Sequence, residues 1–327
     1  MHELCYTRDE PDFLPLYAAA PEMQRLKDVG MNCGCEYTNF PRFRELASYS
    51  RYRHSLGTAR IVWHFTRSRA QTLAALFHDI ATPAFAHTID FMHGDYLQQE
   101  YTEGRTEFLI SHSHVLMQLL AHDGIAVADV ADYHRYPIAD NDSPRLSADR
   151  LEYTLGNLAG YGLQASDVLQ DYYDDLCVGE DGGTPELAFR HADIAAAFGF
   201  DSLKTSRIYV ADEDRYAMQR LSEIVARAVE KGVLTPDALY TTESAVIARL
   251  CADDELRSHW ERFRALHEML RDEAAAPEAD RRVILAKRRC IDPLIVGQGR
   301  LSAVNPSYAA ALQDFLRTPQ TGWLCAK

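Results

Sequence analysis

The sequence predicts an all-α fold, a helical bundle with a mostly helical C-terminal extension and one small β-hairpin. Two observations support it: apolar residues recur at helical spacing along most of the chain, and β-prone runs are short and confined to its last section. The chain has 327 residues, of which 47% are hydrophobic, enough to bury a sizeable core. We expect two units, residues 1–180 and residues 181–327, with the second packed on the first.

The first forty residues predict short helices and loops, because prolines interrupt them repeatedly. Two longer helices follow, and their apolar positions are Ala59, Val62, Trp63 and Thr66, then Ala70, Leu73, Ala74 and Phe77. Pro83 ends the second of them. Residues 108–120 are apolar on most sides, which predicts a buried helix.

Residues 140–144 predict a turn, and Ser147 supplies a hydroxyl cap for the helix that follows it. Residues 171–185 are acidic, contain glycine and lack apolar periodicity, so we expect a surface loop there. Two amphipathic helices come next, with apolar positions Ala217, Leu221, Ile224, Val225 and Ala228, then Leu256, Trp260, Phe263, Leu266 and Leu270. Finally, residues 283–285 and 294–296 are β-prone and predict the hairpin.

Composition excludes some classes of function. The formal net charge of -14 argues against broad nucleic-acid binding, which requires a basic face. An anionic substrate stays compatible, because a metal ion and a few arginines can reverse the field inside one pocket. No apolar stretch is long enough to span a bilayer, and residues 1–5 lack the pattern of a secretory signal. With seven scattered cysteines read as reduced thiols, we expect a cytoplasmic protein without a membrane partner.

The histidines are clustered, since nine of the 13 fall between His54 and His134. Within this region an apolar helix runs directly into the pair His78-Asp79. Burying such a pair is costly unless a cation compensates it. His54 and Asp149 would complete a set of two imidazoles and two carboxylates. That set suits one divalent ion, and we expect Mn, Fe, Co, Ni, Zn or Mg.

The order His54, then His78-Asp79, then Asp149 resembles the HD superfamily of metal-dependent phosphohydrolases. Longer motifs are similar to its deoxynucleoside triphosphate triphosphohydrolase subgroup, and they read Arg51-x-x-His54-Ser55-Leu56-Gly57, His78-Asp79-x-x-x-Pro83-x-Phe85-x-His87 and Asp149-Arg150-x-x-Tyr153. The resemblance covers roughly residues 40 to 160. Thr82 stands where that subgroup commonly has a second histidine.

The resemblance implies an HD-domain helical bundle and assigns a role to individual residues. The metal ligands would be His54, His78, Asp79 and Asp149. The catalytic residues would be His87, Asp79 and Arg51, with His87 as a general acid for the leaving group. The substrate contacts would be Arg51, Arg53 and Tyr153, with Arg51 on a phosphate oxygen.

The expected function is hydrolysis of a nucleotide or related phosphate ester by a metal-activated water. Three alternatives stay open: a triphosphohydrolase that releases triphosphate, a di-iron oxygenase, and a non-catalytic nucleotide sensor. An oxygenase would need a second metal, for which His112, His114 and His134 are candidate ligands. On one helix, His112 and His114 would point about 200° apart. The basic residues 287–289 could form a solvated face, a regulatory nucleotide site or a contact in a homo-oligomer.

Overall fold

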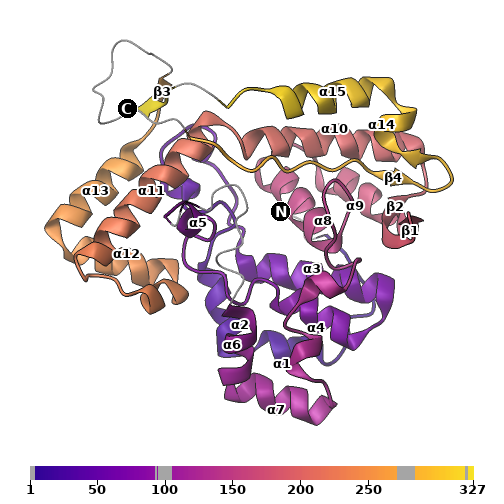
Figure 1. Ribbon diagram of the computed structural model, residues 1–327, viewed down its shortest axis with the longest axis horizontal. Helices are drawn as coiled ribbons and strands as arrows, with labels where there is room; N and C mark the ends of the chain where they lie inside the picture. Colours follow the sequence, from indigo (N-terminus) through magenta and orange to yellow (C-terminus); the bar gives the residue numbers. More distant parts are fainter. Residues whose placement is uncertain (1–3, 93, 95–104, 271–283, 321–322) are drawn as a thin grey trace.

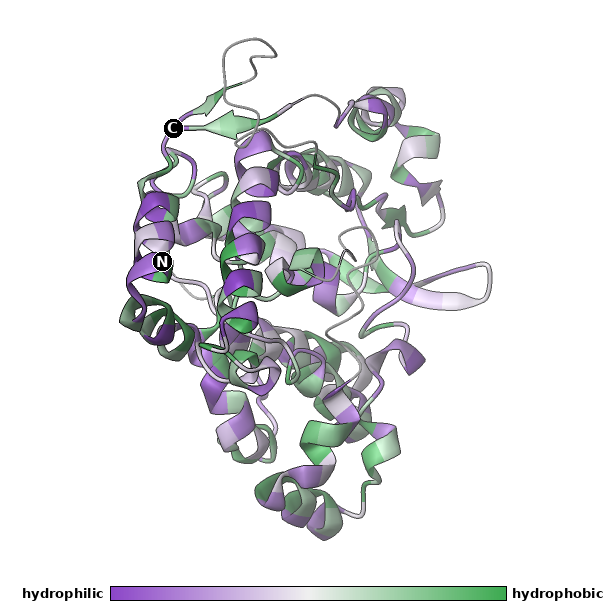
Figure 2. Ribbon diagram, turned by 60° about the vertical axis from the view of Figure 1, so that its left-hand side comes forward, coloured by the Kyte–Doolittle hydropathy of each residue, from purple (hydrophilic) through white to green (hydrophobic). Residues whose placement is uncertain are grey.

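The computed structural model describes residues 4–92, 94, 105–270, 284–320 and 323–327, and the predicted helical class is confirmed (Figure 1). Most helices carry both hydrophobic and hydrophilic residues (Figure 2), as expected for helices that pack on one side. In the part of the chain that the structure describes, no helix combines the length and the apolar character that a membrane span requires.

The N-terminal segment forms short helices, as its prolines predict: α1 (Leu14–Ala18), α2 (Pro21–Gln24), η1 (Arg25–Asp28) and η2 (Cys35–Tyr37). Two longer helices follow, α3 (Arg51–Thr66), which contacts η1, and α4 (Arg69–Phe77), which contacts α1. The hydroxyls of Ser50 and Ser68 cap these two helices by accepting backbone N–H groups from their first turns. Buried side chains of α1, α2, α3, α4 and α7 together form one hydrophobic cluster.

The chain continues through α5 (Thr88–Met92), α6 (Thr106–His112), α7 (His114–Asp123), η4 (Val127–Asp129) and η5 (Tyr133–Arg135). The predicted single buried helix over residues 108–120 is wrong. Ser113 ends α6 and caps α7 by accepting the Leu116 N–H, because a serine side chain competes for backbone donors. Phe108, Val115 and Met117 are exposed. Helix α8 (Ala148–Gly160) begins at the predicted cap, Ser147, and packs along α3.

The predicted surface loop over residues 171–185 is also wrong. Helix α9 (Ser166–Asp174) is followed by strands β1 (Leu176–Asp181) and β2 (Thr184–Phe189), which pair antiparallel. Gly182 and Gly183 form the turn, with φ angles of 62° and 80°. A two-residue hairpin turn of this type needs positive φ at both positions, so the Gly-Gly pair was a hairpin signal.

The predicted hairpin between residues 283–285 and 294–296 is wrong in its pairing. Ile284 and Leu285 lie outside any strand, and Val283 lies outside the described residues. Instead, β4 (Leu294–Ile295) pairs parallel with β2 and antiparallel with β5 (Gly299–Arg300). The sheet order is β1-β2-β4-β5, and a two-stranded pair joins β3 (Met269–Leu270) to β6 (Cys325–Ala326). The pairing buries Leu294 and Ile295 beside β2, a long-range gain that local sequence does not display.

The remaining helices are α10 (Ala192–Ile208), α11 (Asp212–Glu230), η6 (Pro236–Tyr240), α12 (Glu243–Ala252), α13 (Asp254–Ala265), α14 (Leu301–Val304) and α15 (Pro306–Arg317). The two predicted amphipathic helices correspond to α11 and α13, but the second ends earlier than predicted, because Leu266 is its C-cap and Leu270 lies in β3. One hydrophobic cluster joins residues 84–91 to α11, α12 and α13, and another joins α3 and α8 to β2, α10 and α15. Residues from both expected units therefore share cores, while the boundary near residue 180 stays a prediction.

Glu243, at the start of α12, forms hydrogen bonds with two segments that lie far from it in the sequence, residues 30–37 and the turn at Phe85. Its buried carboxylate accepts the Gly30 N–H at 2.9 Å, the Phe85 N–H at 3.2 Å and the Tyr37 hydroxyl at 2.7 Å. The carboxyl group of Glu36 lies near the carboxylate of Glu243, beside Gly30. Burial, together with the negative charge of Glu243, raises the pKa of Glu36 to about 8. Near neutral pH, Glu36 is therefore held in its protonated form.

This raised pKa predicts a stability that depends on pH. The unfolded chain releases the Glu36 proton near the ordinary value of 4.5, whereas the folded chain keeps it to about 8. Folding should therefore weaken as the pH rises from about 4.5 to about 8, by up to about 1.4 kcal/mol per pH unit. Glu36→Gln should flatten this slope in urea unfolding measured from pH 5 to 8. The exposed Glu45→Gln is the control, and parallel slopes for wild type and Glu36→Gln would contradict the assignment.

Candidate metal centre

The four predicted metal ligands come from the ends of three helices. His54 lies in the first turn of α3, and Asp149 lies in the first turn of α8. His78 is the C-cap of α4, and Asp79 follows it directly. Since α3 packs against both α4 and α8, the helix ends bring residues that are far apart in the sequence to one place.

The ligand atoms of these side chains lie close together. The Nε2 atoms of His54 and His78 are 3.1 Å apart, and the Asp149 Oδ1 lies 2.9 Å from the first and 3.6 Å from the second. The Asp79 Oδ2 lies 3.5 Å from the His78 Nε2 and 3.8 Å from that of His54. Atoms that share one ion at bond lengths of about 2 Å are spaced by about 3 Å. Within the described residues, the one group whose ligand atoms all lie within 4.8 Å of one another is His54, His78 and Asp149, and Asp79 lies outside it.

Both imidazoles are oriented to present a lone pair at this point. The Nδ1 of His78 donates to the Ala75 carbonyl at 2.7 Å, and the Nδ1 of His54 lies 2.6 Å from a Glu152 carboxylate oxygen. In its neutral form, with the one N–H at Nδ1, each imidazole would offer the Nε2 lone pair to a cation. Although burial alone would lower the pKa of His54, Asp149 and Glu152 raise it to about 10. The same carboxylates would stabilise a divalent ion, so the donor set fits a metal.

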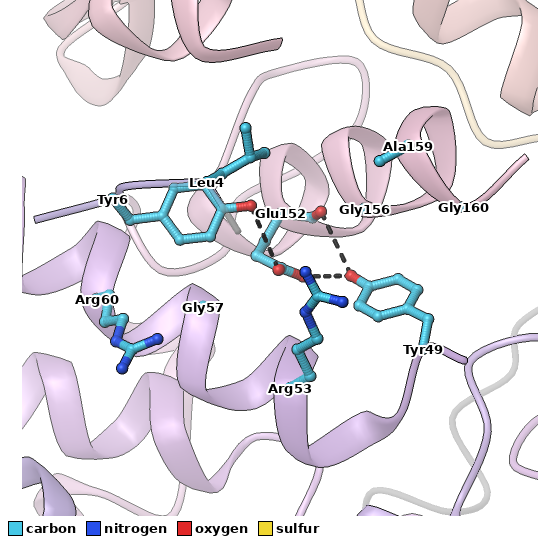
Figure 3. Close-up of a pocket in the computed structure, with 10 residues that line it drawn as sticks. All are labelled: Leu4, Tyr6, Tyr49, Arg53, Gly57, Arg60, Glu152, Gly156, Ala159 and Gly160. Atoms are coloured by element: carbon cyan, nitrogen blue, oxygen red, sulfur yellow. Dashed lines mark hydrogen bonds between the residues drawn. The ribbon is translucent and has the colours of Figure 1, made fainter. Parts of the chain in front are cut away.

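Glu152 lies in a small cavity behind His54 (Figure 3). The hydroxyls of Tyr6 and Tyr49 both point at its carboxylate, and the Tyr6 bond measures 3.4 Å. Gly57 of α3 lies opposite, where an added Cβ would come within 2.5 Å of a Glu152 oxygen. A glycine at this position therefore lets the carboxylate reach the imidazole of His54.

Arg51 and Thr82 hold Asp79. The Nη1 of Arg51 donates to both Asp79 oxygens at 3.0 and 3.1 Å, and the Thr82 hydroxyl donates to Oδ1 at 2.7 Å. Burial would raise the pKa of Asp79, but the positive charge of Arg51 and the neighbouring histidines hold it far below its usual range. Asp79 is therefore ionised. Thr82 thus serves as a hydrogen-bond donor to this carboxylate.

His87 follows a strained turn. Phe85 and Ala86 have φ angles of 64° and 46°, a left-handed conformation that is uncommon for residues with a Cβ. The Phe85 N–H is held by Glu243, and the Ala84 N–H donates to a backbone carbonyl at 2.7 Å. The His87 Nδ1 lies 2.9 Å from the buried Asp90 carboxylate. These contacts fix the imidazole at the edge of the metal centre.

A cavity of about 410 Å³ opens in front of the metal centre. His54, His78, Asp79 and Asp149 line one part of it, and His87, Arg51 and Tyr153 also line it. The Tyr153 ring lies 6.4 Å from the His54 ring and 6.2 Å from the Tyr209 ring, measured between centroids. The cavity thus offers an aromatic wall beside the metal ligands, and its volume suits a small molecule.

The structure does not bring every sequence candidate to this cavity. Arg53 lines the small cavity behind His54 instead (Figure 3). His112 and His114 are exposed on α6 and α7, and neither lines the large cavity. His134 does line it, with its Nε2 3.5 Å from an oxygen of Asp140.

Arg289 is the residue that sequence reasoning missed. Its Nη2 lies 3.4 Å from the His87 Nε2, and its side chain lines the large cavity. The sequence placed it in a basic run beside a predicted hairpin, and no spacing connects it to a residue 202 positions earlier. The tertiary fold is what brings the two together.

Glu152→Gln should weaken metal binding by about 10- to 100-fold, because the amide no longer fixes the His54 tautomer as a carboxylate does. Titration calorimetry with Mn²⁺ or Zn²⁺ would measure the loss. Glu180→Gln, an exposed change on the β1–β2 hairpin, is the matched control. Equal affinity in wild type and Glu152→Gln would show that Glu152 does not position the ligand.

Two curated proteins are similar to this chain, while no family model matches it. The uncharacterized protein YdhJ of Bacillus subtilis is 25% identical over 214 residues, 64% of this chain and 64% of that protein. The chain therefore spans just under two thirds of YdhJ. The metal-dependent phosphohydrolase cns2 of Cordyceps militaris is 25% identical over 331 residues, 94% of this chain and 88% of that protein. The second similarity supports a distant relation to metal-dependent phosphohydrolases along most of the chain.

Proposed function

We propose that this protein is a metal-dependent phosphohydrolase of the HD superfamily, acting on a nucleotide or related phosphate ester. The observation that carries the proposal is the convergence of three helix ends, which puts two imidazole nitrogens 3.1 Å apart beside two carboxylates. The similarity to a metal-dependent phosphohydrolase over 94% of the chain supports it independently.

His54, His78, Asp79 and Asp149 would hold one divalent ion. Such an ion lowers the pKa of a coordinated water toward neutrality and polarises a phosphoryl oxygen. Arg51 keeps Asp79 ionised and in place, and its guanidinium borders the cavity, where it can offset negative charge on the phosphoryl group.

His87 would supply a proton to the leaving-group oxygen. The Asp90 carboxylate accepts a hydrogen bond from the His87 Nδ1–H and thereby orients the ring. The imidazole lines the large cavity. Tyr153 would pack against the leaving group, which favours an aromatic or apolar moiety such as a nucleoside. We also propose that residues 1–180 form the catalytic unit and that residues 181–327 complete its cavity, since Tyr209 and Arg289 line it.

Release of triphosphate is the less favoured reaction. Arg150, next to Asp149, has its guanidinium engaged by three acceptors: the Arg145 carbonyl at 2.9 Å, Asp140 at 3.1 Å and Asn141 at 2.9 Å. These bonds compete with a polyphosphate for the same donors. A di-iron oxygenase is disfavoured because the described residues offer a single metal-binding group.

Asp79→Ala should reduce bound metal by at least about tenfold and abolish hydrolysis, while the circular dichroism spectrum stays helical. Removing the carboxylate leaves Arg51 buried without its ion pair, which costs about 3–5 kcal/mol. Asp79→Asn, which keeps the shape, should therefore lose metal with less loss of stability. The exposed Asp171→Ala is the control for metal content by mass spectrometry. Full activity in Asp79→Ala would refute the assigned site.

The reaction itself can be identified by its product. The purified protein, supplied with Mn²⁺ or Ni²⁺, would be incubated with nucleoside mono-, di- and triphosphates and simple phosphate esters. We expect ion chromatography to show inorganic phosphate and no triphosphate. Triphosphate as the product would establish the triphosphohydrolase reaction, and nucleotide binding without any turnover would establish a sensor.

A further inference from the structure

The contact between Arg289 and His87 fixes the protonation state of the imidazole. A guanidinium only donates hydrogen bonds, so its Nη2, 3.4 Å from the His87 Nε2, faces a nitrogen that offers a lone pair. On the other side of the ring, Nδ1 donates to Asp90 at 2.9 Å. His87 is therefore neutral in this arrangement, with its proton on Nδ1.

The surroundings of His87 favour the same state. Burial lowers its pKa most, Asp90 raises it, and the positive charges of Arg289 and Arg51 lower it again, leaving it below its ordinary value. Cys33 lies against the His87 backbone, and its thiol stays protonated because burial raises its pKa to about 12. A neutral ring with an unprotonated Nε2 cannot act as a general acid toward the cavity. Acid catalysis by His87 thus requires a change at Arg289.

We propose that Arg289 and His87 form a binding site for a tetrahedral dianion, and that an anion bound there draws Arg289 from the imidazole and lets Nε2 take up a proton. The identity of the anion as the substrate's phosphoryl group rests on the proposed function. The planar fork of a guanidinium matches two oxygens of such a group. The anion therefore competes directly with Nε2 for the Arg289 donors, and it also attracts a positively charged imidazole.

The proton balance of a turnover follows. Nε2 takes one proton from solvent when the anion binds. As the oxygen of a water molecule bonds to phosphorus and that water releases one proton to solvent, the bond between phosphorus and the leaving oxygen breaks. The Nε2 proton passes to the leaving oxygen, which departs as an alcohol. The imidazole is then neutral again, and Arg289 can return to Nε2 when the phosphate leaves. The Nε2 atom of His87 thus carries a proton only when a phosphoryl group is bound.

The backbone around Arg289 is anchored on both sides, so the switch needs movement of the side chain alone. Before it, the Ala286 N–H donates to Gln320 at 2.7 Å. After it, the Cys290 carbonyl accepts the Ser143 hydroxyl at 3.1 Å, and the Asp292 N–H donates to the Pro144 carbonyl at 2.9 Å.

Sulfate tests the proposal because it is a tetrahedral dianion that does not titrate near neutral pH. Calorimetry of sulfate binding to the metal-loaded protein at pH 7, in two buffers of different ionisation enthalpy, gives the protons taken up. We expect about one proton per sulfate in wild type. Arg289→Gln should bind sulfate at least about tenfold more weakly, and His87→Gln should bind it without proton uptake. Sulfate binding with no proton uptake in wild type would overturn the proposal.

A second measurement needs neither turnover nor sulfate. Nuclear magnetic resonance titration of His87 should give a higher pKa in Arg289→Gln than in wild type, and an intermediate effect in Arg289→Lys. Arg288→Gln is the matched control, since it removes the same charge from an exposed neighbour that donates to the Thr318 carbonyl. An unchanged His87 titration in Arg289→Gln would refute the switch. Proton-linked sulfate binding in a protein that hydrolyses nothing would instead refute only the proposed function.

Discussion

The structure depends on how four side chains, the predicted metal ligands His54, His78, Asp79 and Asp149, come together at three helix ends. The lone pairs of two imidazole nitrogens 3.1 Å apart repel each other, and so do the carboxylates of Asp79 and Asp149, and a cation between them would relieve both repulsions. Arg51 offsets part of this charge by pairing with Asp79. The three helix ends that carry the ligands must therefore be held together by packing elsewhere, and the N-terminal turns of α3 and α8 are fixed by the serine caps at their starts. Rigid helix ends of this kind would hold the predicted ligands in place before a metal binds.

Much of this centre was readable from the sequence, for a physical reason. An apolar helix that ends in His78-Asp79 predicts that this polar pair is buried. Burying it costs free energy unless a cation or a hydrogen-bond partner stabilises it. The serine cap of α8 was equally local. The Gly182-Gly183 turn of the β1–β2 hairpin was a local signal as well, but the pairing of β4 was not, because its partner β2 lies about a hundred residues earlier. Arg289 was missed for the same reason, since its meaning depends on a distant histidine and not on its own neighbours.

Two residues of the C-terminal half contact the turn that carries His87. Glu243 holds the backbone N–H of Phe85 within the strained part of the turn, and Arg289 meets the imidazole itself. The strain is compatible with a stable fold because the surrounding contacts compensate for it. The position of His87 is thus a property of the whole chain, although its motif lies in the first third.

Gly57 is a helical glycine whose replacement by alanine would not raise the thermal stability without disturbing Glu152. Replacing glycine by alanine within a helix ordinarily stabilises a protein by about 1 kcal/mol, because the unfolded chain loses freedom. At Gly57 the new methyl group would displace the Glu152 carboxylate, and at Gly156 it would strike the Tyr49 ring at 2.4 Å. Replacing every helical glycine by alanine to raise thermal stability would therefore disturb the Glu152 carboxylate that contacts His54. At the interface of α3 and α8, the space that a stabilising methyl group would need is therefore occupied by the side chains of Glu152 and Tyr49.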